Sequence, residues 1–398
     1  MPPLSLYIHL PWCVRKCPYC DFNSHAPRGA IPEARYVDAL LRDLDSDRAW
    51  VQGRTVETLF IGGGTPSLFS PEALARLLDG VRTRVAVAAD AEITLEANPG
   101  TAELARFRGF REAGVNRLSI GVQSFEEGKL RTLGRIHGRA EALAAAQAAR
   151  AAGFENFNLD LMYGLPEQSL EQALADVDRA IALRPAHLSV YQLTLEPNTP
   201  FQRDPPVLPS EDTVEEMQQA LIAALEGAGY GQYEVSAYAR GGRHCRHNRN
   251  YWEFGDYLGI GAGAHGKITR GTEIVRTSKA RHPTAYLAGA GTAGVRQVTR
   301  LAPDDLACEF MLNALRLRDG FALALFSERT GLPLAHIEAP LAAARAKGLL
   351  AIDASRARAT ELGWRFLNDL VALFLPAEAE PAPPAERQER IAAGTGVR

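Results

Sequence analysis

Short apolar runs alternate with amphipathic stretches from residue 5 to about residue 240 of this 398-residue chain. Runs rich in β-branched residues, separated by stretches of helical periodicity, are typical of βα repeats that build a parallel sheet. Six runs predict strands and one more is a seventh candidate; in order they cover residues 5–10, 57–61, 92–96, 117–122, 157–162, 187–195 and 232–238. Because six or seven βα units are too few to close an eightfold barrel, we predict an α/β fold with an open, partial barrel of the (β/α)6 type.

The pattern changes after residue 300, where helical stretches predominate. We predict four parts: a partial barrel over residues 1–240, a connecting segment over 241–300, a helical, winged-helix-like appendage over 301–375, and a tail over 376–398. The tail is rich in proline and charge and has almost no large apolar residues. Such a composition cannot bury a core, so we expect the tail to be disordered.

Polar residues recur at or near the ends of the predicted strands. In chain order these are Cys13, Cys17, Cys20, the run 62–66, Glu96, Asn98, Gln123, Ser124, Asp160, Gln192 and Thr194. Buried parallel strands are usually continuous apolar runs, and an isolated buried charge is costly. Ligands of parallel α/β sheets bind at the carboxyl ends of the strands. The series therefore predicts a ligand site at this rim of the sheet.

Three cysteines within eight residues form a CxxxCxxC pattern: Cys13, Cys17 and Cys20. Thiolates suit iron–sulfur clusters, and a four-iron cluster normally takes four of them. Three ligands on a short loop would leave one iron open to a small molecule. A structural zinc ion is the alternative, with a fourth ligand from His9, Asp21 or His25. A disulfide framework is excluded, because five cysteines in 398 residues are too sparse.

The overall charge excludes one class of partner. The formal net charge is -3 and the sequence pI is about 6.3, so no global basic field would draw the chain to nucleic acid. The N-terminal sequence lacks the pattern of a signal peptide, and no run of about eighteen apolar residues predicts a transmembrane segment. We expect a cytoplasmic protein, because a reducing cytosol also suits cysteines that must stay thiolates.

Five sequence blocks follow one another along the chain: YIHLPWCVRKCPYCDFNSH, FIGGGTPS, LEANPG, GVQSF and DLMYGLP. In this order and spacing they resemble the oxygen-independent coproporphyrinogen III oxidase-like family of the radical S-adenosylmethionine (SAM) superfamily, over roughly residues 4–370. The resemblance implies a partial radical SAM barrel, a 4Fe-4S cluster on the three cysteines, and S-adenosyl-L-methionine on the open iron. It also implies that one electron can cleave SAM to a 5'-deoxyadenosyl radical.

The resemblance further implies which residues contact SAM. They are Tyr7, Gly63, Gly64, Thr65, Glu96, Gln123, Arg135 and Asp160. The chemistry is reasonable, because glycines leave backbone groups open to a close ligand and a carboxylate accepts hydrogen bonds from ribose hydroxyls. Taken singly, the glycine triplet would be a turn, Glu96 a solvated strand end and Arg135 a surface salt-bridge residue.

Position 22 separates this chain from the oxidases of the family, which carry a further cysteine two residues after the third ligand. The residue there is Phe22. The first predicted strand also begins almost at once, at Ser5, without the extension that usually precedes it in the oxidases. Both departures put decarboxylation of coproporphyrinogen in doubt.

A later block, HNxxYW, resembles the signature of the heme chaperone branch of the family. The block covers residues 247–252, and its candidate heme contacts are His247, Tyr251 and Trp252. An imidazole can ligate heme iron, and the two aromatic rings offer flat apolar surface to a porphyrin. His244, Cys245 and His265 are alternative iron ligands nearby. The glycine-rich run 259–264 fits a degenerate dinucleotide loop, but no helix is predicted after it, so we interpret it as a turn that faces a ligand.

The resemblance implies a heme chaperone that binds a 4Fe-4S cluster, SAM and heme and transfers heme to an acceptor protein, with an electron donor for the cluster. The alternative is an oxygen-independent coproporphyrinogen III oxidase, which performs SAM-dependent oxidative decarboxylation to protoporphyrinogen IX. The sequence leaves open whether SAM is cleaved, and so whether the protein is an enzyme. It also leaves open the acceptor, transient contact with membrane-associated acceptors, and a homodimer.

Overall fold

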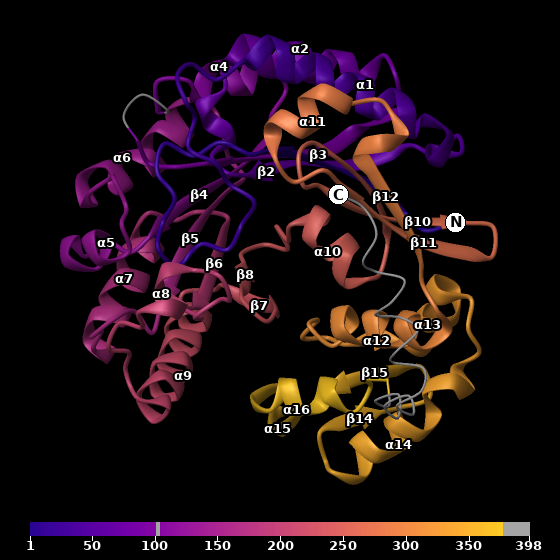
Figure 1. The fold of residues 1–398 in the computed structure, drawn as a ribbon. Coiled ribbons are helices and arrows are strands. Elements are labelled where there is room, and N and C mark those ends of the chain that lie inside the picture. Colours follow the sequence, from indigo (N-terminus) through magenta and orange to yellow (C-terminus); the bar gives the residue numbers. More distant parts are fainter. Residues whose placement is uncertain (101–103, 377–398) are drawn as a thin grey trace, which may run out of the picture.

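The computed structural model describes residues 1–100 and 104–376, and most of its strands belong to one curved sheet with helices on the outside (Figure 1). The predicted tail lies, from residue 377, outside the described residues. The centre of the sheet is a run of parallel strands in chain order. These are β1 (Leu4–Leu10), β2 (Val56–Gly63), β3 (Val87–Ala97), β4 (Arg117–Gln123), β5 (Phe157–Tyr163) and β6 (His187–Gln192).

The predicted α/β fold with a partial barrel is confirmed. The sheet has twelve strands, and within the described ranges its edge strands β12 and β7 do not pair with each other, so the barrel is open. Helices α1 to α7 connect the parallel strands, and α8 and α9 lie between β6 and β7. They are α1 (Glu33–Val51), α2 (Pro71–Arg82), α4 (Phe107–Glu112), α5 (Glu127–Thr132), α6 (Arg139–Ala151), α7 (Leu170–Ala182), α8 (Pro200–Arg203) and α9 (Glu211–Gly227).

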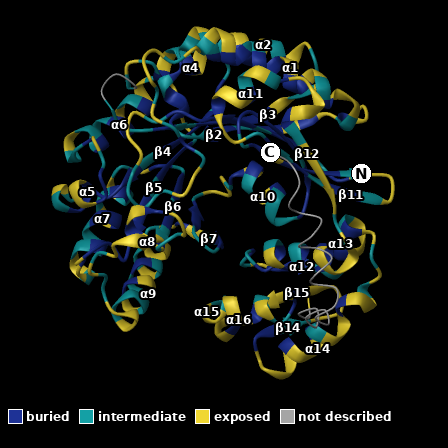
Figure 2. Cartoon of the chain, viewed as in Figure 1, coloured by how far each residue is buried: buried dark blue, intermediate teal, exposed yellow. Residues whose placement is uncertain are grey.

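Helix α2 shows how the sequence defines these helices. Ser70 caps the first turn, because its hydroxyl accepts a hydrogen bond from the Ala73 N–H at 3.2 Å, and Pro71 occupies the first helical position. Its apolar side chains recur at helical spacing and are buried against the barrel: Leu74, Leu77, Leu78 and Val81. Figure 2 shows the same arrangement across the molecule, with buried strands inside and exposed residues along the outer helices.

The seventh strand candidate, over residues 232–238, is wrong as a single strand. The segment forms an antiparallel hairpin of β7 (Gly231–Glu234) and β8 (Ala237–Ala239), and β8 pairs antiparallel with β6. The carboxylate of Glu234 accepts hydrogen bonds from the backbone N–H and the hydroxyl of Ser236, at 3.2 and 3.0 Å. These bonds close a tight turn, so the chain reverses where one strand was predicted.

The segment 241–300 extends the sheet on the other side of β1. Strand β9 pairs parallel with β1, and β10 to β12 follow as antiparallel strands. Its elements are α10 (Arg246–Trp252), β9 (Asp256–Ile260), β10 (His265–Arg270), β11 (Glu273–Lys279), α11 (Pro283–Gly289) and β12 (Arg296–Arg300). The division of the chain into separate domains stays a prediction.

The C-terminal part is helical with a small antiparallel sheet, as a winged-helix-like appendage requires. Its helices are α12 (Pro303–Ala314), α13 (Leu323–Thr330), α14 (Glu338–Ala346), α15 (Glu361–Arg365) and α16 (Leu367–Ala372). Its strands are β13 (Phe321–Ala322), β14 (Leu350–Ile352) and β15 (Arg356–Ala359), in the order β13-β15-β14. Phe310 anchors its core and packs edge-on against Phe254, with ring centres 5.7 Å apart.

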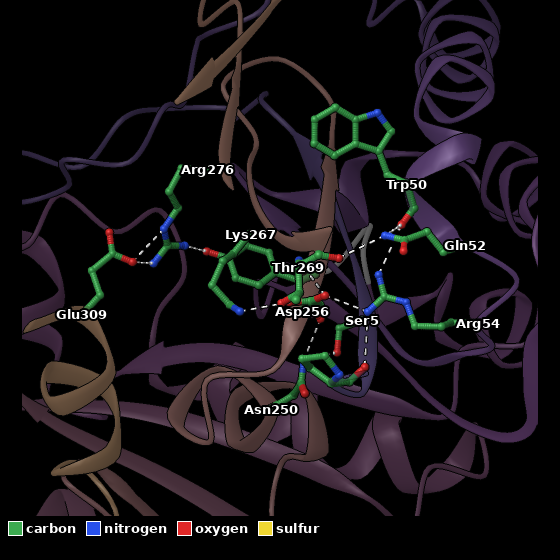
Figure 3. Close-up of polar contacts among 12 residues, drawn as sticks. Ser5, Trp50, Gln52, Arg54, Asn250, Asp256, Lys267, Thr269, Arg276 and Glu309 are labelled. Atoms are coloured by element: carbon green, nitrogen blue, oxygen red, sulfur yellow. Dashed lines mark hydrogen bonds and ion pairs between the residues drawn. The ribbon is translucent and has the colours of Figure 1, made fainter. Parts of the chain in front are cut away.

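A buried hydrogen-bond network around Asp256 holds β9 beside β1 (Figure 3). Asp256 accepts hydrogen bonds from the ammonium of Lys267 at 2.9 Å and from the guanidinium of Arg54 at 2.7 Å. Thr269 adds two bonds to the same carboxylate, from its backbone N–H and its hydroxyl, both at 2.9 Å. Asn250 bridges the Ser5 hydroxyl and the Asp256 carbonyl, at 2.9 and 3.0 Å. The carboxylate joins β9 to β10 and to the segment before β2, and the Asp256 carbonyl joins β9 through Asn250 to β1.

Replacing Asp256 with Asn tests this network. The change keeps the side-chain shape but leaves Lys267, whose side chain is 1% exposed, without its buried counter-charge. Removing one partner of a buried ion pair costs about 3–5 kcal/mol, so we expect a loss of that size in the free energy of unfolding, measured with urea. Asp38→Asn removes an exposed pair with Arg76 and should cost less than about 1 kcal/mol. Equal losses in the two variants would contradict the account.

Candidate functional site

A cavity of about 520 Å³ lies at the carboxyl ends of the parallel strands, as the rim of polar residues predicts. Its wall contains all three predicted cluster cysteines and every predicted SAM contact except Tyr7. These wall residues are Cys13, Cys17, Cys20, Gly63, Gly64, Thr65, Glu96, Gln123, Arg135 and Asp160. We call this space the cluster cavity. The structure brings the predicted residues together, and their roles as ligands stay predictions.

The cysteine loop follows β1 and leaves its thiols free and half-buried. The Cys13 N–H donates to the His25 carbonyl at 3.1 Å, and the Cys20 N–H donates to the Cys17 carbonyl at 3.2 Å. Thr65 donates its hydroxyl proton to the Cys13 sulfur, at 3.5 Å. Burial raises the pKa of Cys13 and of Cys20. The loop therefore presents thiols that a bound cation would convert to thiolates.

The thiols fit an iron–sulfur cluster better than a single zinc ion. Among the described residues, no group of three or more His, Cys, Asp or Glu side chains is arranged around one metal ion. A zinc site needs four ligands that converge on one point. In a four-iron cluster each thiolate binds a different iron, so the cysteines can line a cavity without converging. His9 is also unavailable for zinc, because both ring nitrogens have hydrogen-bond partners, the Tyr7 hydroxyl and the Asn23 carbonyl.

Two glycines allow the carboxyl end of β2 to approach the segment that leads into the cysteine loop. A Cβ on Gly63 would lie 2.6 Å from the His9 ring, and its φ of +121° also favours glycine. A Cβ on Gly64 would lie 2.5 Å from the Trp12 carbonyl oxygen. Side chains at these positions would push the loop away from the cavity. The glycines therefore keep the backbone close to where SAM is predicted to bind.

The carboxylates of the cavity have unusual electrostatics. Burial raises the pKa of Glu96 to about 7; the Gly63 N–H, which donates to this carboxylate at 3.0 Å, opposes the shift, and Asp160 adds to it. Burial likewise raises the pKa of Asp160, whose carboxylate accepts hydrogen bonds from Asn158 at 2.7 Å and Ser119 at 3.0 Å. Glu96 is thus a half-buried acid that changes charge near neutral pH.

Arg135 lies in the cavity and not on the surface. Its guanidinium donates to the Asn98 side-chain oxygen at 2.6 Å and to the Gly121 carbonyl at 2.5 Å, and it lies 3.9 Å from the Cys17 sulfur. The surface salt bridge that Arg135 alone would suggest is therefore absent among the described residues. Nearby, the Tyr191 hydroxyl donates to Gln123 at 2.8 Å. These bonds hold polar groups from several strands on one wall.

A second cavity, of about 950 Å³, adjoins the first and shares four wall residues with it: Asp21, Phe22, Gly63 and Glu96. Tyr7 lies here, with its hydroxyl 2.9 Å from His9 Nδ1. Tyr251 of the HNxxYW block also lines this space. We call it the adjoining cavity. Of the predicted heme contacts, only Tyr251 faces it.

The structure does not place His247 and Trp252 on either cavity wall. His247 is buried, with Nδ1 2.8 Å from the Thr58 hydroxyl and Nε2 2.8 Å from the Tyr251 hydroxyl. Trp252 lies under the Arg316 guanidinium, 4.3 Å from the ring centre. In this arrangement His247 has no nitrogen free for iron. Its role here is to fix α10 against β2.

Sequence reasoning missed several polar residues of the cluster cavity. Ser119, Asn158 and Tyr191 all line it. Asn158 could have been found, because it precedes Asp160 by two residues on a strand, and side chains two apart face the same side. Tyr191 alternates with apolar residues along its strand, as a tyrosine of the core also does. The sequence pattern therefore did not indicate that Tyr191 lines the cavity.

Residues 7–180 match the radical SAM superfamily, and residues 301–366 match the HemN C-terminal domain. The heme chaperone HemW of Escherichia coli (strain K12) is 55% identical over 376 residues, covering 94% of this chain and 99% of that protein. The heme chaperone HemW of Bacillus subtilis (strain 168) is 35% identical over 377 residues, covering 93% and 99%. Among solved structures, coproporphyrinogen III oxidase (HemN) from Escherichia coli, a radical SAM enzyme, has a TM-score of 0.79 and 28% identity, covering 94% of this chain and 90% of that chain.

These matches and the three-cysteine cavity define a radical SAM protein of the HemN-like fold. Within that superfamily, the chain belongs to the HemW family. Membership implies a 4Fe-4S cluster and SAM as cofactors, and the residues of the cluster cavity suit both.

Cysteine substitutions test the cluster cavity. After anaerobic reconstitution the protein should hold about four irons per chain. Cys13→Ala, Cys17→Ala and Cys20→Ala should each lose most of this iron, together with the cluster's electron paramagnetic resonance signal on reduction. Cys308→Ala is the matched control, because Cys308 lies in α12, far along the chain from the cavity. A cysteine variant that keeps its full iron and signal would contradict the assignment of that residue.

The raised pKa of Glu96 predicts how stability depends on pH in the cofactor-free protein. Its carboxyl keeps a proton up to about pH 7 when folded, whereas the unfolded chain releases that proton near the ordinary value. The protonated Glu96 carboxyl therefore contributes fully to the stability of the folded state below its ordinary pKa. This contribution is lost as pH rises through about 7. Between about pH 5 and about pH 8, the wild type should lose on the order of 1–3 kcal/mol more unfolding free energy than Glu96→Gln. Urea denaturation at both pH values measures this, and parallel curves for the two proteins would contradict it.

Proposed function

We propose that this protein is a heme chaperone on a radical SAM scaffold, which binds a 4Fe-4S cluster, SAM and heme and transfers the heme to an acceptor protein. The observation that carries the proposal is similarity along nearly the whole chain to proteins named heme chaperone HemW. The coverage includes both the cluster cavity and the C-terminal part, so the resemblance is not confined to a common cofactor domain.

The cluster cavity supports the cofactor part of this proposal. Cys13, Cys17 and Cys20 would hold the cluster, whose open iron would bind SAM and, given an electron, supply reductive cleavage chemistry. The backbone at Gly63 and Gly64 would approach SAM closely, and Glu96 would accept hydrogen bonds from its ribose. Arg135 would hold the wall next to Cys17 in place, since its other bonds fix it to Asn98 and Gly121. An electron-donor protein is then a required partner.

The site of Phe22 supports a chaperone over an oxidase. Its side chain is 60% exposed and lines both cavities, at the position where the family's oxidases carry a further cysteine. An exposed aromatic ring between two cavities offers a flat apolar surface to a porphyrin. The second candidate, oxygen-independent decarboxylation of coproporphyrinogen III, is favoured by the structural similarity to the HemN oxidase.

The remaining partners follow from the same proposal. No described helix combines the length and apolar character that crossing a bilayer requires. We place the protein in the cytoplasm, because the free cluster thiols need a reducing compartment. Acceptors at a membrane would then be reached by transient contact, and a homodimer is compatible with the proposal.

An anaerobic heme titration of the cluster-reconstituted protein tests the function. We expect saturable binding of about one heme per chain, which visible absorbance spectra measure. The heme-loaded protein is then mixed with a heme-free acceptor such as an apo-cytochrome. The acceptor should gain heme faster from the loaded protein than from the same concentration of free heme.

The oxidase candidate is tested in the same preparation. Coproporphyrinogen III, SAM and a reductant are added anaerobically, with a HemN-type oxidase as the positive control. The chaperone proposal predicts no protoporphyrinogen IX above background. Product formation without saturable heme binding would overturn the proposal in favour of the oxidase.

A further inference from the structure

The adjoining cavity is large enough to hold a flat macrocycle. Its volume of about 950 Å³ is at the upper end of the range for cofactor pockets. One side is formed by β1 and the HNxxYW helix, through Tyr7, His9 and Tyr251, and the other by residues of β10 to β12. Tyr257 and Phe22 add two more rings to this wall. The lining is therefore rich in aromatic surface, which suits a porphyrin.

Most groups on this wall that could ligate iron are already engaged. His9 has both ring nitrogens in hydrogen bonds, to the Tyr7 hydroxyl and to the Asn23 carbonyl, each at 2.9 Å. The Tyr251 hydroxyl bonds to His247, and the Tyr257 hydroxyl accepts from Arg276. Each would have to break a hydrogen bond before it could bind iron.

His265 differs from these groups. Its side chain is exposed on the cavity wall. Within residues 1–100 and 104–376, neither of its ring nitrogens has a hydrogen-bond partner. Burial lowers its pKa, and the charges of Arg276 and Arg281 lower it further, which favours the neutral imidazole. A neutral imidazole with a free nitrogen is the form that ligates heme iron.

The glycine-rich turn places His265 at this wall. The turn joins β9 to β10, and His265 is the first residue of β10, opposite Ser278 of β11. A Cβ on Gly259 would lie 1.9 Å from the His265 carbonyl oxygen, so glycine is needed for the two strands to come this close. Asn23 of the cysteine loop donates to the Ala262 carbonyl in the turn at 2.9 Å. The turn is therefore fastened to the loop that carries the cluster cysteines.

The wall also holds a cation without a partner for its side chain. Arg281 is exposed, and its guanidinium forms no hydrogen bond or ion pair in the part of the chain that the structure describes. The other cations of the wall are occupied: Lys279 pairs with Asp43 and Asp47, and Arg296 pairs with Asp47. A free guanidinium next to an exposed imidazole matches a porphyrin, whose propionates lie at its edge.

We propose that heme binds in the adjoining cavity, with His265 as the ligand to its iron and Arg281 paired with a propionate. This inference rests on the proposed function and assigns the site of its cargo. It moves the iron ligand from His247 to His265 and keeps Tyr251 as part of the wall. The ligand that the glycine-rich turn was predicted to face is then heme.

Anaerobic heme titrations of four reconstituted proteins test the assignment: wild type, His265→Ala, His247→Ala and, as a matched control, His336→Ala. His336 lies in the C-terminal part and pairs with Asp304. In His265→Ala we expect binding at least about tenfold weaker and a shifted Soret band, with added imidazole restoring the wild-type spectrum. His336→Ala should match the wild type. Iron content and circular dichroism show that each variant is folded and carries its cluster.

Arg281→Gln provides a second readout. It should weaken binding of heme but leave binding of heme dimethyl ester, which has no free propionates, at the wild-type level. His265→Ala with wild-type affinity and spectrum, together with an altered His247→Ala, would overturn the inference. Failure of the wild type itself to bind heme would instead overturn the proposed function, so the two failures are distinguishable.

Discussion

The buried charge of Asp256 is the constraint on which the two-cavity architecture depends. Strand β9 enters the sheet about 250 residues after β1 along the chain, yet the two strands pair in register from Leu4 and Asp256 onward. Lys267 and Arg54 compensate the carboxylate from both sides (Figure 3). Without that compensation a buried charge would be costly. The pairing puts the glycine-rich turn after β9 beside the cysteine loop after β1.

Because the cysteine loop and the glycine-rich turn are neighbours, the cluster cavity and the adjoining cavity share a wall. Asn23 is the direct link: its side chain donates to the Ala262 and Arg281 carbonyls, at 2.9 and 2.8 Å, while its own carbonyl bonds to His9. Glu96 and Gly63 face both spaces. A short path of hydrogen bonds therefore connects the cysteine loop to residues beside the adjoining cavity. Under the proposed function, this arrangement would bring cluster, SAM and heme together on one scaffold.

Local sequence patterns predicted the central parallel strands and the cluster cavity. Both signals, the apolar run of a strand and the polar residues at its end, lie within a few residues of each other in the sequence. They could not predict that β9 pairs with β1, since that pairing joins distant segments. They also merged β7 and β8, because the turn at Ser236 depends on a hydrogen bond that the Ser236 N–H donates to the Glu234 carboxylate. The HNxxYW block identified residue types suited to heme, but not that Thr58 and Tyr251 already occupy both nitrogens of His247. Such partners depend on tertiary contacts that a motif does not specify.

Under the proposed function, this radical SAM scaffold carries heme next to its cluster cavity. An anaerobic crystal structure of the cluster-loaded protein with heme and SAM measures this directly. We expect heme between the β1 rim and the β10–β12 strands, with SAM behind the shared wall formed by Gly63 and Glu96. Heme in the separate groove lined by Tyr233, His244 and Phe321, between the barrel and the C-terminal part, would contradict it.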